Sequence, residues 1–267
     1  MPKKNSPVGV FDSGLGGLTV VHALKQTLPT ESIIYFGDTA RVPYGTKSEE
    51  TVTRFSLQIA EFLIRRHVKL IVVACNTASA VALTSLRRKN TIPVIGVIEP
   101  AARAAVAATR SHHIGVIGTR ATINSGAYTR MLRELDYDTR ITSAACPLFV
   151  PLAEEGWTKG KIAEMVAEEY LTPFQSSDVD TLIPGCTHYP LLKKTIQSLL
   201  PDNVTLIDSP QAVAAEVAST LKNGNIASDA EADELRCFVS DMPQKFEELA
   251  HRFLGEPLGE VTLLQLD

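Results

Sequence analysis

Two cysteines in matching surroundings are the residues of this chain best suited to chemistry. The segment LIVVACNTAS (70–79) runs from five apolar residues into Cys75, and TLIPGCTHYP (181–190) runs from a similar stretch into Cys186. Each thiol follows a run typical of a buried strand and precedes a helix start, where free N–H groups lower the pKa of a thiol. The polar residues that follow are Asn76 and Thr77 in one segment, and Thr187 and His188 in the other. We therefore predict two reactive thiols, with His188 as a thiol partner or proton shuttle.

Other interpretations of the same residues stay open. A buried cysteine is commonly only a small apolar side chain, and a lone histidine is commonly a surface residue. Cys75, Cys186 and His188 offer soft metal ligands, but the chain has no CxxC or HxxxH pair, and we predict no metal site. A thiol hydrolase would need only one cysteine. Cys146 and Cys237 lack comparable neighbours and are assigned to packing.

A matched pair of thiols indicates a particular reaction. Two similar groups on opposite faces of one carbon can remove a proton from one side and return a proton from the other. One sulfur must then be a thiolate while the other is a thiol, and the two exchange roles when the reaction reverses. The chain has no lysine motif for pyridoxal phosphate and no nucleotide-binding loop, so we predict stereoinversion without a cofactor. A ligand-binding protein with redox-sensing thiols is the non-enzymatic alternative.

A glycine-rich turn near the N-terminus is a second candidate. GVFDSGLGGLTVV (9–21) has the pattern of a strand, a turn and a helix start, in which Gly14, Gly16 and Gly17 would let the backbone approach a ligand closely. Free N–H groups at the helix start favour an anion. Asp12 lies at the carboxyl end of the strand, where a charge is costly unless it is paired. The alternative is a tight turn in which Asp12 or Ser13 caps the helix.

Two further segments carry candidate residues. In DTARVPYGTKS (38–48) the Tyr44 hydroxyl and the Gly45 N–H could bind a substrate, or the segment is a plain turn with a packed tyrosine. In CPLFVPLAEEGW (146–157) we expect Glu154 and Glu155 on a turn into a helix. They are helpers in the chemistry or solvated acids at a helix N-terminus.

The elements that must position these residues alternate along the chain. Short runs rich in Val and Ile predict strands buried on both faces, as in a parallel sheet; they are 8–12, 32–37, 70–74, 94–98, 113–118, 180–184 and 204–208. Amphipathic stretches at 48–66, 158–171 and 210–222 predict helices between them. We therefore expect an α/β fold of the doubly wound type, with ligands at the carboxyl ends of the strands.

The chain also shows a faint internal repeat. IGVIEP (95–100) resembles VTLIDSP (204–210), and each follows a cysteine motif by about 20 residues. We predict two similar α/β domains with mostly parallel sheets and the active site in the cleft between them. Domain one comprises 1–98 and 208–267, and domain two comprises 99–207.

The overall composition excludes several classes of protein. Of the 267 residues 45% are hydrophobic and 21% charged, and the formal net charge is −4 with no basic block. Nucleic acid is therefore not expected as a partner, and no apolar stretch is long enough to span a membrane. The N-terminus has no signal-peptide pattern. We expect a cytoplasmic protein without a disulfide framework.

Five motifs taken together resemble one family. FDSGLGGLTV, PYGTKS, VVACNTAS, VPLAEEG and GCTHYPLL occur in this order between about residues 8 and 210. The set is similar to the glutamate racemases, within the cofactor-independent Asp/Glu racemase superfamily. The resemblance implies two α/β domains, no cofactor, and Cys75 and Cys186 as the two acid/base thiols. By the family's usual assignment Cys75 acts on D-glutamate and Cys186 on L-glutamate.

The resemblance also assigns roles to the neighbouring residues. Asp12 and His188 match the groups that assist the thiols, and Glu154 matches an acidic helper. The implied substrate contacts are Asp12, Ser13, Tyr44, Gly45, Asn76, Thr77, Thr187 and His188. Asp12 would suit the substrate ammonium, and the hydrogen-bond donors would suit its carboxylates. Aspartate racemases typically carry Thr-Glu after the second cysteine, so Thr187-His188 favours glutamate over aspartate or another amino acid.

The family's biology sets the remaining expectations. Its members make D-glutamate for bacterial peptidoglycan, and so for cell wall biogenesis and cell shape. A homodimer is common among them. Some members carry an N-terminal extension linked to activation by a peptidoglycan precursor. Only seven residues precede Val8 here, so dependence on that activator is not expected.

Overall fold

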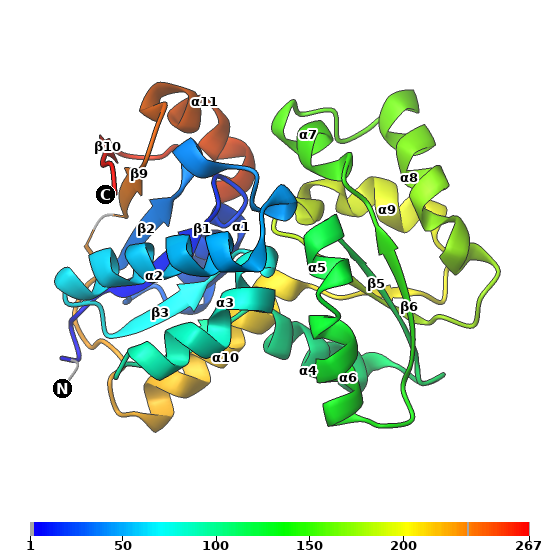
Figure 1. Cartoon of the computed structure of the whole chain (residues 1–267), viewed down its shortest axis with the longest axis horizontal. Helices are drawn as coiled ribbons and strands as arrows, with labels where there is room; N and C mark the ends of the chain where they lie inside the picture. The colour runs from blue at the N-terminus through cyan, green and yellow to red at the C-terminus, as the bar shows by residue number, and fades with distance from the viewer. Residues whose placement is uncertain (1–2, 234, 267) are drawn as a thin grey trace.

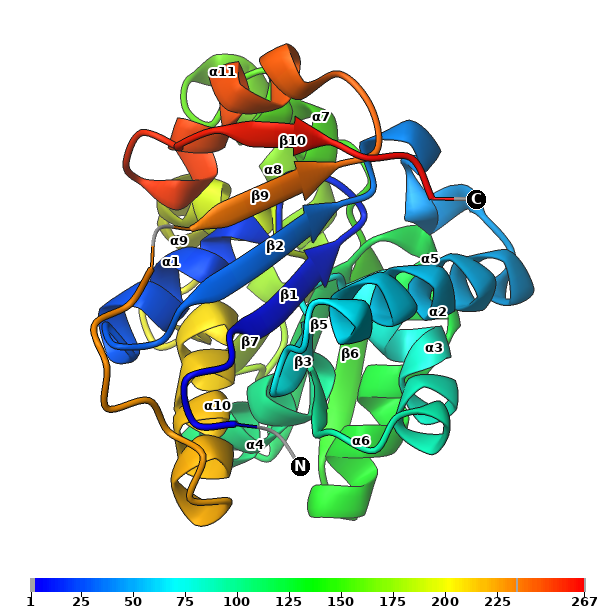
Figure 2. The same cartoon turned by 90° about the vertical axis from the view of Figure 1, so that its left-hand side faces the viewer.

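The strands of this protein form two separate, fully parallel sheets. The computed structural model describes residues 3–233 and 235–266, and the strands in these ranges form one sheet of six and one of four. The first has the order β10-β9-β2-β1-β3-β4 and the second β6-β5-β7-β8. All eight strand pairings are parallel. Figure 1 shows the two halves side by side, and Figure 2 shows the first sheet.

The elements have the following bounds. The strands are β1 (Val8–Asp12), β2 (Ile33–Gly37), β3 (Leu70–Val73), β4 (Val94–Gly96), β5 (His113–Gly118), β6 (Arg140–Ala145), β7 (Thr181–Gly185), β8 (Thr205–Leu206), β9 (Arg236–Val239) and β10 (Val261–Leu263). The α-helices are α1 (Leu18–Thr27), α2 (Glu49–Arg65), α3 (Asn76–Lys89), α4 (Ile98–Ala108), α5 (Arg120–Asn124), α6 (Ala127–Leu135), α7 (Phe149–Glu154), α8 (Lys161–Gln175), α9 (Lys193–Leu199), α10 (Ser209–Asn223) and α11 (Pro243–Leu254). Short 3₁₀ helices cover Thr39–Arg41, Tyr44–Thr46 and Tyr189–Leu192.

Helices cover both faces of each sheet, because the strands are apolar on both sides. Along β1, Val10 packs into a core with α1, α10 and α11, whereas the next residue, Phe11, packs into a core with α2 and α3. In the second sheet Ile117 faces α7, α8 and α9, and Val116 faces α4 and α6. The doubly wound α/β architecture expected from the continuous apolar runs is confirmed.

The chain crosses between the sheets twice. It leaves the first sheet after β4 through α4 and returns from β8 through α10. Glu99 and Pro100, predicted as a crossing, lie in the first turn of α4, and Ser209 and Pro210 begin α10. The domain boundaries at 98/99 and 207/208 stay a prediction. No helix in the described part of the chain is long and apolar enough to cross a membrane.

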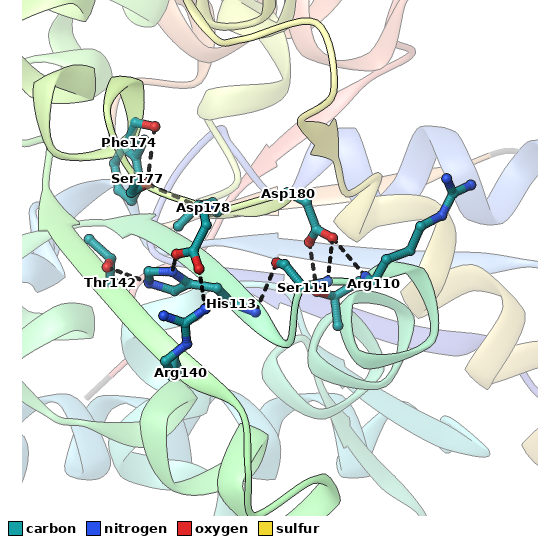
Figure 3. A network of polar contacts seen from close by, with 11 residues as sticks. Arg110, Ser111, His113, Arg140, Thr142, Phe174, Ser177, Asp178 and Asp180 are labelled. Carbon is teal, nitrogen blue, oxygen red and sulfur yellow. Dashed lines mark hydrogen bonds and ion pairs between the residues drawn. The ribbon is translucent and has the colours of Figure 1, made fainter.

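A polar network ties the amino-terminal ends of the second sheet's strands together (Figure 3). His113, the first residue of β5, bonds Asp178 through Nδ1 and Thr142 of β6 through Nε2. Asp178 also pairs with Arg140. Asp180 accepts hydrogen bonds from the Thr109 hydroxyl and from the backbone N–H groups of Arg110 and Ser111. These contacts hold the amino-terminal end of the sheet together. The candidate residues lie at the opposite end, where the strands have their carboxyl ends.

Candidate active site between the two sheets

The carboxyl ends of strands from both sheets enclose one cavity of about 630 Å³. Its volume is within the usual range for a small-molecule site. The lining includes every residue that the family resemblance assigns to the site except Asp12: Ser13, Tyr44, Gly45, Cys75, Asn76, Thr77, Glu154, Cys186, Thr187 and His188. Val42, Pro43, Thr46, Thr119, Arg120, Pro147, Leu148, Val150 and Pro151 complete it. The first sheet contributes the loops after β1, β2 and β3, and the second contributes those after β5, β6 and β7.

Both predicted reactive thiols reach this cavity, from different sheets. Cys75 follows β3 and is the N-cap residue of α3, and Cys186 directly follows β7. Each is more than nine-tenths buried. Cys146 and Cys237 are also buried, but neither lines the cavity. The two cysteine motifs of the sequence therefore converge on one enclosed space.

The environment of Cys75 holds it as a thiol. Its Sγ accepts the N–H of Ala78 at 3.5 Å, as the helix start predicts, and donates to Ser13 Oγ at 3.7 Å. Burial, reinforced by the negative charge of Asp12, nevertheless raises the pKa of Cys75 to about 12. The helix N-terminus does lower this pKa through the Ala78 N–H, as expected, but the net shift is upward. Desolvation of the thiolate outweighs the two hydrogen bonds.

Cys186 has the opposite kind of neighbour. His188 Nδ1 lies 3.8 Å from Cys186 Sγ, and its Nε2 lies 3.0 Å from Glu154 Oε1. Burial opposes protonation of His188, but the hydrogen bonds and charges of Cys186 and Glu154 outweigh it and raise its pKa to about 10. Burial likewise opposes ionisation of Glu154, yet His188 and the nearby Lys245 lower its pKa. Glu154, His188 and Cys186 thus form a series of polar contacts in which the protonated imidazole of His188 lies beside the sulfur of Cys186.

Glu154, which pairs with His188, lies in a helix that the sequence analysis did not predict. It is the last residue of α7, so it lies at a helix C-terminus and not on a turn into a helix. The correction has a simple cause: the apolar run at 148–153 forms a short helix of its own, and α8 begins only at Lys161. Glu155 follows as the C-cap residue of α7 and does not line the cavity.

Asp12 lies behind the cavity wall, with no exposed surface. Its carboxylate accepts the backbone N–H of Gly14 at 3.0 Å, and Thr187 Oγ1 donates to it across the cleft at 3.5 Å. Burial raises the pKa of Asp12, although His188 and backbone donors counteract this effect. Asp12 itself therefore occupies the anion position expected at the glycine turn.

The glycines of that turn serve the protein's own packing. A Cβ at Gly16 would lie 2.2 Å from Thr187 Oγ1 and 2.6 Å from His188 Nδ1. A Cβ at Gly17 would lie 2.6 Å from Asp12 Cβ. The close approach predicted for this segment is thus an approach to side chains of the opposite sheet, which lets His188 reach its position.

Tyr44 lines the cavity, but its hydroxyl is directed away from a ligand. The hydroxyl donates to Asp38 Oδ2 at 2.5 Å. Asp38 is fully buried and also holds Arg41 and Ser240. Burial and the Asp38 carboxylate raise the pKa of Tyr44 well above its ordinary value. The hydroxyl proton of Tyr44 is therefore already used within the protein, and a substrate contact by Tyr44 stays a prediction.

The amide and hydroxyl groups at the start of α3 meet partners from the second half. Tyr128 donates its hydroxyl to Asn76 Oδ1 at 2.7 Å, which leaves the amide NH₂ of Asn76 as a donor. Thr77 Oγ1 lies 3.1 Å from Thr119 Oγ1 and 3.3 Å from Thr122 Oγ1. Sequence reasoning missed Tyr128, Thr119 and Thr122. A signal was present for the two threonines, because TRAT (119–122) follows a predicted strand of the second half.

Among the described residues, no three or more His, Cys, Asp or Glu side chains are grouped so as to hold a metal ion. The cavity instead combines two thiols, one imidazole with its carboxylate, and several neutral hydrogen-bond donors. Such a set can bind carboxylates and move protons on and off a ligand.

Comparison with known proteins identifies the family. The sequence model described as "Asp/Glu/Hydantoin racemase" matches residues 14–217, which include both cysteine motifs. The chain belongs to this family. It is accordingly an amino-acid racemase, an enzyme of the isomerase class.

Individual members of the family are similar over nearly their whole length. The glutamate racemase of Geobacter metallireducens is 52% identical over 261 residues, covering 97% of each chain. The crystal structure of the glutamate racemase isoform RacE1 from Bacillus anthracis has a TM-score of 0.95 at 42% identity and covers 98% of each chain. The glutamate racemase from Francisella tularensis in complex with D-glutamate has a TM-score of 0.93 at 42% identity and covers 99% of each chain.

Proposed function

We propose that this enzyme interconverts L- and D-glutamate by a two-thiol acid/base mechanism in which Cys75 and Cys186 act on opposite faces of the substrate α-carbon. The observation that carries the proposal is the placement of the two thiols: each ends a strand of a different sheet, and both line one cavity. The similarity to glutamate racemases, one of them in complex with D-glutamate, supports glutamate as the substrate.

The cavity offers donors that suit the two carboxylates of glutamate. Hydroxyl and amide groups come from Ser13, Asn76, Thr77 and Thr187, and backbone comes from Tyr44 and Gly45. Fixed donors near the α-carboxylate would stabilise the negative charge that develops when the α-proton leaves. Asp12 acts from behind the wall by its charge on Cys75 and its contact with Thr187, since its carboxylate is not exposed to the ligand.

In the direction from L to D, the thiolate of Cys186 takes the α-proton. An S–H bond forms as the C–H bond breaks, and the electron pair moves into the α-carboxylate. The thiol of Cys75 then gives its proton to the opposite face of the α-carbon and becomes the thiolate. The reverse direction uses the same groups with their roles exchanged. No electrons are gained or lost, so the mechanism requires no cofactor.

The charges around the two sulfurs favour this starting state. Cys75 is buried beside Asp12, which raises its pKa to about 12 and keeps its proton in place. Cys186 lies beside a protonated His188, which itself pairs with Glu154. These surroundings suit the L to D direction, in which Cys75 gives a proton and Cys186 takes one.

The biological role follows from the product. D-glutamate would supply peptidoglycan synthesis in the cytoplasm, and so cell wall biogenesis and cell shape. A homodimer is the assembly that we expect.

The decisive experiment compares Cys75→Ser and Cys186→Ser with a matched control, Cys237→Ser, which changes a buried cysteine in β9 away from the cavity. Optical rotation with L-glutamate and no added cofactor measures racemisation, and exchange of the α-hydrogen in heavy water measures proton abstraction. Both site variants should lose racemisation, and the control should keep it. Full racemisation by both site variants would overturn the two-thiol mechanism. A panel of other amino acids, aspartate first, tests the choice of substrate.

A further inference from the structure

The last turn of α11 contacts the His188–Glu154 pair from the other side of the cleft. Phe253 is buried, and its ring meets the His188 ring edge to face, with centroids 5.3 Å apart and planes at 80°. Gly16 lies directly against the same imidazole. Both ring nitrogens of His188 have polar partners, and these apolar contacts further restrict where the ring can lie.

The neighbouring residue on α11 holds the other member of the pair. Arg252 Nη1 donates to the backbone oxygen of Glu154 at 2.6 Å. The guanidinium of Arg252 packs against Gly156. A Cβ at Gly156 would lie 3.0 Å from Arg252 Nη1, so a larger residue there would crowd the arginine. Lys245, near the start of the same helix, is close enough for its charge to lower the pKa of Glu154. Figure 1 and Figure 2 both show α11 next to α7, which carries Glu154 at its end.

We propose that Arg252 and Phe253 are positioning residues, which hold Glu154 and the His188 ring so that Nδ1 faces the sulfur of Cys186. The proposal rests on the proposed two-thiol function and extends it to a helix that does not line the cavity. Neither residue touches the substrate or the thiols. Their effect on the reaction passes through His188.

The placement of α11 gives this contact a consequence for catalysis. The helix packs into the core of the first sheet, whereas His188 and Glu154 follow elements of the second half. The orientation of His188 therefore depends on how the two halves meet. A change in their separation would move Phe253 and Arg252 relative to the imidazole, and would therefore weaken proton transfer at Cys186 as well as change the cavity.

The test uses two buried phenylalanines of the same helix. Phe253→Leu removes the ring that contacts His188, and Phe246→Leu is its matched control, because Phe246 is equally buried in the same core and packs on Tyr35. Since small misplacements of catalytic groups cost up to about 100-fold in rate, we expect Phe253→Leu to lower kcat by about 10-fold with KM changed by less than about 3-fold. Phe246→Leu should lower the melting temperature similarly and leave kcat unchanged.

Two further comparisons isolate the path through His188. Arg252→Ala should lower kcat in the same way, and His251→Ala, an exposed change on the same turn, should not. In a His188→Asn background, Phe253→Leu should cause no additional loss of kcat, because the group that it positions is gone.

Equal effects of Phe253→Leu and Phe246→Leu on kcat would overturn the proposal, as would full additivity with His188→Asn. Failure of the proposed function looks different. In that case the unchanged enzyme would not racemise glutamate, or Cys186→Ser would retain activity, before any α11 variant is compared.

Discussion

Replacing His188 by asparagine is the most direct probe of the charge beside Cys186. Asparagine keeps a hydrogen-bonding side chain of similar reach but removes the positive charge. In the structure His188 Nδ1 lies 3.8 Å from Sγ, and its pKa is raised to about 10, so the imidazole is protonated at neutral pH. The substitution therefore removes the positive charge beside Cys186 Sγ, which the proposed mechanism needs when that sulfur acts as the base, and leaves Glu154 Oε1 without its imidazole partner.

The size of the effect follows from this geometry. Two unit charges about 4 Å apart interact by about 4 kcal/mol at an effective dielectric constant of 20. Hydrogen bonds from asparagine and water replace part of this interaction energy. Since each 1.36 kcal/mol corresponds to about a tenfold change in rate, we expect kcat to fall by about 100- to 1,000-fold. KM should change by less than about threefold, because the contribution of His188 is to proton transfer more than to binding.

The assay is initial-rate racemisation in both directions, followed by circular dichroism at pH 8. The equilibrium constant between enantiomers is one, so kcat/KM must fall equally in the two directions, which provides an internal check. The control is His113→Asn, the same substitution in the network of Figure 3, where it should reduce stability and leave kcat unchanged. An unchanged kcat with weakened binding in His188→Asn would refute the assigned role, as would an equal loss in the control.

Three other predictions test the charges of the structure. Lys69→Met leaves the fully buried carboxylate of Glu31 without its partner at 2.5 Å and should cost about 3–5 kcal/mol in urea unfolding, with much of the loss recovered by adding Glu31→Met. Burial opposes ionisation of Asp180, but hydrogen bonds led by the Thr109 hydroxyl outweigh it and lower its pKa to about 2. Its stabilising effect is therefore present above the unfolded pKa of about 3.9 and is lost as pH falls towards 2, so Asp180→Asn should flatten thermal stability across that range. Arg120 is the only Lys or Arg among the described residues that line the cavity, so Arg120→Gln should raise KM for glutamate with little change in kcat, and high salt should diminish the difference.

The sequence predicted β1 to β5, β7 and β8, and it missed β6, β9 and β10. Continuous apolar runs marked β1 to β5 and β7, because a parallel strand covered on both faces needs apolar residues at every position. The strand β6 (RITSAA) forms an edge and is partly exposed along its whole length, so it has no such run. The strands β9 (RCFV) and β10 (VTL) each include a polar residue, Arg236 and Thr262, that interrupts the apolar run.

The convergence of the site residues was predictable for a topological reason. Parallel strands present all their carboxyl ends at one edge, so two cysteines at strand ends in two similar halves were expected to meet in one cleft. Contacts between distant segments were not predictable in this way. Phe253 lies in a helix that the sequence analysis did not predict, and Tyr128 reaches Asn76 from the opposite half. Neither contact leaves a local signature in sequence.

The difference between the two thiols is the feature that spacing alone could not predict. Both cysteines have a similar context in sequence, an apolar strand followed by polar residues, and this predicted two reactive thiols without saying how their charges differ. The fold breaks the equivalence, because Asp12 comes from the same sheet as Cys75, whereas His188 is two residues from Cys186. A racemase that transfers a proton from one face to the other needs one thiol and one thiolate at the start of each turnover. In the proposed mechanism, opposite charges beside two similar sulfurs would favour that state, whereas two sulfurs in identical surroundings would not be distinguished.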